Sequence, residues 1–161
     1  MEKNRVTYET ARRLKDFGYT QDWFNGCVLY DKNRELVAYN PYAPERDKGS
    51  ITAPTLDEAT RWLRSEHKID ILPYRRAVGD GGHCDDKYQC AIVVPPMFFE
   101  RCVEDKELSV AISNNETFDS FDDAVAESLS FALELLENKR NGWKSKWFKN
   151  AVSSLLNNQM K

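Results

Sequence analysis

The spacing of apolar positions predicts a helix, three strands and a second helix in succession between residues 55 and 137. Thr55 and Glu58 have the spacing of a capping box, in which each side chain accepts a hydrogen bond from the other residue's backbone N–H. The apolar stripe of this first helix is Leu56, Ala59, Trp62 and Leu63. Ser120 is the predicted N-cap of the second helix. Its stripe should face the core and comprises Phe121, Val125, Leu129, Ala132, Leu133 and Leu136.

The three strands between these helices are predicted from runs with high β propensity. The first run, residues 69–74, contains Pro73, which indicates an edge position or a bulge. A glycine-rich turn over residues 79–83 precedes the second run, residues 88–94. Residues 108–113 alternate larger apolar side chains with smaller ones and form the third strand.

A shorter helix and a β-hairpin are predicted before this unit. Thr7 is the predicted N-cap of a helix of about three turns, and Gly18 ends it. The apolar positions of that helix are Tyr8, Ala11, Leu14 and Phe17. Residues 27–30 and 36–39 flank a polar turn, which is typical of a hairpin. Residues 40–54, which combine prolines and a glycine with charged side chains, are predicted to form a surface loop.

Together these elements predict an α+β fold with two layers, an antiparallel sheet that carries helices on one face. Residues 1–138 are expected to form a single domain, with residues 55–137 as its α-β-β-β-α core unit. A helix and hairpin precede that unit, and a C-terminal helix follows it. A chain of 161 residues is long enough to bury a core of this size.

Charge is divided unevenly along the chain. From residue 138 onward there is no acidic residue, and six basic ones are present: Lys139, Arg140, Lys144, Lys146, Lys149 and Lys161. Removing these six charges from the net charge of −3 leaves −9 for residues 1–138. Residues 139–161 are therefore predicted to form a basic amphipathic helix. Its apolar face comprises Trp147, Phe148, Ala151, Val152, Leu155 and Leu156.

Three roles are open for this C-terminal helix. It can pack on the acidic body or in a homodimer, it can lie in a groove of a partner protein, or it can contact nucleic acid or a membrane surface. The first is the structural interpretation, and we give it the greatest weight. The candidate partner-binding residues are Trp143, Lys144, Lys146, Trp147, Lys149 and, in the glycine-rich turn, His83.

The sequence does not indicate a catalytic or cofactor site, and the protein is expected not to be an enzyme. The four cysteines are interpreted as free thiols, because they are too few to staple a chain of this size. A zinc site would use His83, Cys84, Cys90 and Cys102, but their spacing lacks the paired CxxC arrangement. Two weaker alternatives remain: Cys84 beside His83 as a reactive thiol, and the aspartates around His83 as a cation site.

No apolar run approaches the roughly 20 residues that a membrane-spanning helix needs. The N-terminal residues also lack the apolar segment of a secretory signal. A cytoplasmic location without membrane contact is therefore the expectation.

The order of elements over residues 55–137 resembles a double-stranded RNA-binding domain. The Gly81-Gly82-His83 segment lies where that family carries a Gly-Pro-x-His loop, and Ser120 opens the second helix in both. The resemblance implies contacts with the RNA minor groove by the loop and with phosphates by the second helix. In this chain Asp122 and Asp123 stand where the family has basic residues, and their charge would repel phosphates.

A second resemblance covers most of residues 5–137. Residues 50–64, with Ala53-Pro54-Thr55 and Trp62-Leu63-Arg64, and later residues 117–124, are similar to small uncharacterised proteins of gut bacteria, their phages and their mobile elements. This resemblance implies an accessory role in such an element and no specific activity. The leading expectation is therefore a non-enzymatic accessory protein that binds another macromolecule, most simply a protein or a second copy of itself. Contact would be made by the C-terminal helix and the aromatic segment 95–102. RNA binding is the alternative.

Overall fold

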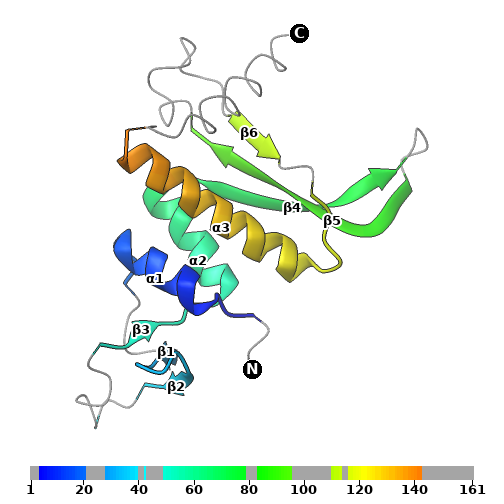
Figure 1. Ribbon diagram of the computed structural model, residues 1–161. Coiled ribbons are helices and arrows are strands. Elements are labelled where there is room, and N and C mark those ends of the chain that lie inside the picture. Colours follow the sequence, from blue (N-terminus) through cyan, green and yellow to red (C-terminus); the bar gives the residue numbers. More distant parts are fainter. Residues whose placement is uncertain are drawn as a thin grey trace. The chain divides into compact units, whose positions relative to one another are not determined.

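The computed structural model describes residues 4–20, 28–39, 42, 49–78, 83–95, 110–113 and 116–142 (Figure 1). These residues form helices and small antiparallel sheets, which confirms the predicted α+β class. The chain divides into two compact units, Met1–His67 (unit 1) and Lys68–Lys161 (unit 2). The boundary at His67 lies inside the segment 55–137, so the single domain over residues 1–138 stays a prediction.

Unit 1 contains a three-stranded antiparallel sheet in the order β2-β1-β3. The predicted hairpin is confirmed: β1 (Val28–Tyr30) pairs with β2 (Leu36–Ala38). Asp31 shapes the turn between them, because its Oδ1 accepts hydrogen bonds from the backbone N–H groups of Asn33 at 2.7 Å and Glu35 at 2.9 Å.

The predicted loop over residues 40–54 is wrong at its end. Ile51–Thr52 forms β3, which pairs with Leu29 and Tyr30 of β1. Ile51 is buried there. A strand of two residues is too short to show an alternation of apolar and polar side chains. It forms by pairing with residues more than 20 positions away in the sequence, and local patterns do not reveal such pairing.

The segment before the first helix ties the unit together. α1 (Tyr8–Asp16) begins at the predicted cap Thr7 and buries Ala11 and Leu14. The Val6 N–H donates to the Pro54 carbonyl at 3.1 Å, and the Tyr30 hydroxyl donates to the Val6 carbonyl at 2.7 Å. The N-terminal strand segment is therefore bonded both to the start of the second helix and to the sheet.

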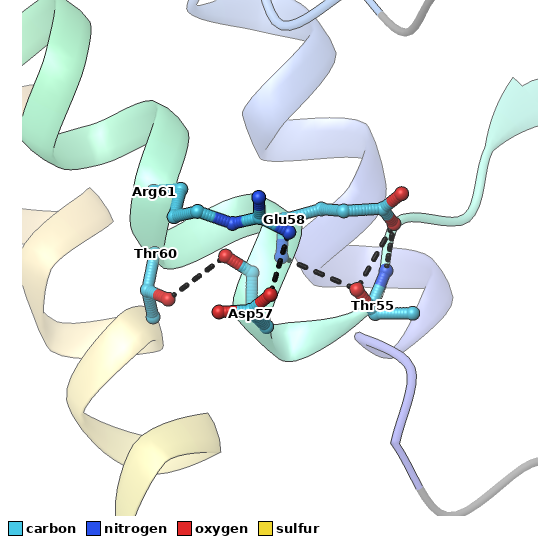
Figure 2. A network of polar contacts seen from close by, with 5 residues as sticks. All are labelled: Thr55, Asp57, Glu58, Thr60 and Arg61. Atoms are coloured by element: carbon cyan, nitrogen blue, oxygen red, sulfur yellow. Dashed lines mark hydrogen bonds and ion pairs between the residues drawn. The ribbon is translucent and has the colours of Figure 1, made fainter.

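The capping box of α2 (Leu56–Trp62) is formed as predicted (Figure 2). The Thr55 hydroxyl accepts from the Glu58 N–H at 3.2 Å, and Glu58 Oε2 accepts from the Thr55 N–H at 2.7 Å. One turn further, Arg61 pairs with Asp57 at 2.6 Å. The helix then continues as a π-helical segment, η2 (Leu63–His67). Leu56, Ala59 and Leu63 are buried as the stripe predicts, and Trp62 is partly buried against the ring of Tyr19.

Unit 2 contains a second antiparallel sheet in the order β4-β5-β6. β4 (Asp70–Val78) and β5 (His83–Val94) form a long hairpin, and β6 (Val110–Ser113) pairs with the end of β5. The helix α3 (Phe121–Arg140) packs on β4 and β5 (Figure 1). Of the two alternatives predicted for Pro73, an edge position or a bulge, the edge position is confirmed for the strands described.

Two predictions in unit 2 are wrong. His83 was expected in the glycine-rich turn, but its backbone begins β5 and pairs with Val78, because the hairpin continues past a bulge. At that bulge β5 has two more residues than β4 between the pairs Arg75–Tyr88 and Ala77–Cys84. Phe121 was expected in the core, but 50% of its surface is exposed: it is the first residue of α3, and its ring centroid lies 6.1 Å from that of Tyr88 in β5.

The rest of the α3 stripe is confirmed as core. Its buried face is wider than the predicted stripe and also includes Ala124, Ser128 and Leu135. This width lets one helix contact two strands of the hairpin.

Replacing Thr55 by alanine should lower the free energy of unfolding by about 0.5–2 kcal/mol, since the Glu58 N–H loses its acceptor. The matched control is Thr60→Ala, the same substitution one turn later, where the hydroxyl donates to the Asp57 carbonyl and caps nothing. Urea unfolding measures both. Equal losses from the two variants would contradict the capping role.

Replacing Leu129 by alanine should destabilise the protein by about 2–5 kcal/mol, because the leucine is 1% exposed and alanine leaves a cavity without lowering helix propensity. Glu127→Ala, on the exposed side of the same helix, should change stability by less than about 0.5 kcal/mol. Chemical unfolding followed by circular dichroism distinguishes the two, and a Leu129→Ala protein as stable as the Glu127→Ala protein would exclude the proposed core.

Candidate interaction surface

The two faces of the β4–β5 hairpin differ in what covers them. Side chains alternate between the faces along each strand. Cys90 is 2% exposed in a strand that packs on α3, and the Tyr88 ring centroid lies 6.1 Å from that of Phe121, so both residues face the helix. We call this the inner face. Its other members follow from the alternation and are Ile71, Pro73, Arg75, Ile92 and Val94.

The opposite side of the hairpin, which we call the outer face, carries apolar side chains in solvent. Its members are Asp70, Leu72, Tyr74 and Arg76 of β4 and Gln89, Ala91 and Val93 of β5. Leu72 is 45% exposed and Tyr74 is 42% exposed. They are next to each other along this face, and their cross-strand partners are Ala91 and Gln89. Among the described residues, the other exposed large apolar side chains are Tyr42 and Phe121, which lie elsewhere.

The free edge of β4 is poorly suited to pairing with another strand. The backbone N–H and carbonyl of Tyr88 exchange hydrogen bonds with Phe118 at 2.9 Å each, so by alternation those of Cys90 also point away from β4. Pro73, the partner of Cys90, therefore turns its nitrogen toward the outer edge. Because proline has no N–H to donate, an added strand would lack a central hydrogen bond. The side chains of the outer face, and not this backbone edge, form the candidate surface.

Charged side chains of both signs lie near the bulge of the β4–β5 hairpin. The Arg75 guanidinium lies 5.7 Å from the centre of the Tyr88 ring and 3.9 Å from a carboxylate oxygen of Asp86. Lys87 pairs with Asp119, just before α3. These pairs are largely exposed, so each contributes little to stability. Acidic and basic groups alternate here, and no uniformly basic surface forms among the described residues of this end.

The residues that the sequence predicts for partner binding are not tested by this geometry. Trp143, Lys144, Lys146, Trp147 and Lys149 lie outside the described residues, as does the aromatic segment 96–102. The structure places the backbone of His83 in β5 and does not describe its side chain.

The sequence analysis missed the outer face, although a signal was present. Ile71 and Leu72 are adjacent in β4, so this strand carries large apolar side chains on both faces. A sheet predicted to be covered on one face should instead alternate apolar and polar positions. The departure from alternation marks the exposed patch.

The part of the chain that the structure describes contains no candidate metal site. Within it, no group of three or more His, Cys, Asp and Glu side chains could hold a metal ion. Cys90, one member of the hypothetical zinc set, is a free thiol buried under α3. Burial raises the pKa of the Cys90 thiol above its ordinary value of 9.0, and hydrogen bonds with Ser128 and the Leu72 backbone oppose part of that rise.

His67 has a structural environment. Its ring contacts those of Trp62 at 4.8 Å and Phe17 at 6.2 Å, both edge to face. These contacts hold the ring in an aromatic cluster at the end of η2. Among the described helices, none is long and apolar enough to cross a membrane.

The raised pKa of Cys90 predicts a pH dependence of stability. The neutral thiol favours the folded state below pH 9, and this advantage is lost as the pH rises, because the unfolded chain releases its proton first. The difference in unfolding free energy between the parent protein and Cys90→Ala should therefore shrink from pH 8 to pH 10, by up to about 1.4 kcal/mol per pH unit. Urea titrations at these pH values measure it. A difference that stays constant would contradict the burial argument.

Comparison with protein-family models, with curated proteins and with solved structures found no match to this chain. The resemblances to double-stranded RNA-binding domains and to small proteins of gut bacteria and their phages therefore stay predictions from the sequence.

Proposed function

We propose that this chain is a non-enzymatic accessory protein that acts by binding a protein through the outer face of the β4–β5 hairpin. The observation that carries this proposal is the exposure of Leu72 and Tyr74 side by side on the face away from α3. Water contact with such side chains is unfavourable, and burying them against a partner removes it.

The composition of the outer face is that of a small protein interface. Tyrosine is enriched in the centres of interfaces, because it offers a large rigid surface with a polar end. Leu72 and Tyr74 occupy the centre, and Asp70 and Arg76 lie at the two ends of the same strand face. This arrangement has an apolar centre and a charged rim, which favours a protein over a nucleic acid as partner.

The accessory role rests on the second sequence resemblance. Small proteins of phages and mobile elements are the relatives that the motifs around Thr55 and Trp62 indicate. Their setting suits a protein that works by occupying a surface. The predicted C-terminal residues Trp143, Lys144, Lys146, Trp147 and Lys149 would supply a second contact.

RNA binding through an arrangement like that of a double-stranded RNA-binding domain is the alternative. The start of α3 argues against it. The Ser120 hydroxyl accepts from the Asp123 N–H at 3.1 Å, and both Asp122 and Asp123 lie in the first turn. Two carboxylates at the helix end that should meet phosphates make that contact unfavourable.

The test is site-specific photo-crosslinking in cells. A benzophenone amino acid at position 74 should form a defined protein adduct, and Leu72→Lys in the same chain should abolish that adduct, since a charge then replaces an apolar contact. The matched control places the benzophenone at position 121, where the aromatic side chain is similarly exposed but lies outside the outer face.

The same adducts from positions 74 and 121, or no protein adduct from position 74, would refute binding through the outer face. RNA recovered with the crosslinked protein, lost on His83→Ala and increased on Asp123→Arg, would favour the alternative.

A further inference from the structure

We propose that the protein bound by the outer face is a second copy of this chain, in a symmetric dimer that stacks two hairpins face to face. This inference rests on the proposed function, because it names the occupant of the same surface. It follows from the order of side chains along β4.

That order is self-complementary under a two-fold rotation. The outer face of β4 reads Asp70, Leu72, Tyr74, Arg76: an acid, two apolar residues and a base at equal spacing. The two-fold axis lies in the plane of the interface, runs perpendicular to the strands and passes over Pro73. Rotation about this axis places β4 of the second copy over β4 of the first, with the order of its residues reversed. Asp70 then meets Arg76 of the second copy, and Leu72 meets its Tyr74.

The neighbouring strand follows the same symmetry. Pro73 is paired with Cys90, so the axis also passes over Cys90. Gln89 of one copy then meets Ala91 of the other, a small side chain opposite a longer one. An axis along the strands would instead lay β4 over β6 and separate Asp70 from Arg76, so the charges select the first axis. Opposite charges brought together at a rim fix register and favour encounter.

Both charged residues already take part in interactions within the chain. The dimer does not require them to be free, because complementarity depends on the sign of the charge at each end. The contact between Asp70 and Arg76 of the other copy would occur twice, once at each end of the symmetric interface.

The size of the surface predicts weak association. The outer face spans seven residues at about 3.3 Å each on two strands about 4.8 Å apart, which gives roughly 23 by 10 Å, about 230 Å² in projection. This face is smaller than that of a standard specific complex, which buries about 800 Å² on each partner. The dimer should therefore depend on concentration, with a dissociation constant on the order of 10–1000 µM.

Sedimentation equilibrium of the full chain between about 10 µM and 1 mM tests the inference by charge reversal. Asp70→Arg alone and Arg76→Asp alone should each weaken the dimer by about tenfold or more, because each places like charges opposite one another. The double variant restores opposite charges and should dimerise like the parent protein. The control is Glu127→Arg, which reverses the charge of an exposed residue on α3 and should leave the dimer unchanged.

Thermal unfolding confirms that each variant is folded. Where a single variant is not, Asp70→Lys and Arg76→Glu test the same contact.

A parent protein that stays monomeric at 1 mM would overturn the inference, as would a folded double variant that fails to recover dimerisation. These results are separable from the fate of the proposed function. A monomeric protein that still forms a Leu72-dependent adduct with a different protein from position 74 refutes self-association and leaves the proposed function standing. An adduct from position 74 with the mass of two chains supports both.

Discussion

Unit 2 depends on the contact between α3 and the inner face of the β4–β5 hairpin. A two-stranded hairpin is at best marginally stable by itself, and a buried apolar face against a helix provides what it lacks. Leu129 and Leu133 of this helix are almost completely buried, as are Cys90, Ile92 and Val94 of β5. Because α3 occupies the inner face, the sheet presents its other side to solvent, and the exposure of the outer face follows from this one-sided covering.

The sequence was a good guide where structure is set by neighbours in the chain. The capping box of Thr55 and Glu58, the caps at Thr7 and Ser120, and the β1–β2 hairpin each involve residues within a few positions of one another. Pro73 marked an edge strand correctly, because the missing N–H acts at a single residue.

Features that depend on distant residues were not predictable in the same way. β3 exists because Ile51 and Thr52 meet β1, and His83 lies in a strand because Val78 is opposite it. Periodicity places Phe121 on the apolar stripe of α3 but does not show that half of its surface stays exposed at the first position of the helix. The outer face was missed for a related reason, since exposure of Leu72 and Tyr74 depends on which face the helix covers.

The bulge opposite Arg76 limits how far the outer face can extend. Two extra residues in one strand increase the local twist, and the end of the hairpin curves away from the rest of the sheet (Figure 1). A long flat hairpin with apolar side chains on its exposed face can stack repeatedly on identical sheets, as in a fibril. Curvature at one end of the hairpin and a proline without an N–H in the outer strand both disfavour such stacking.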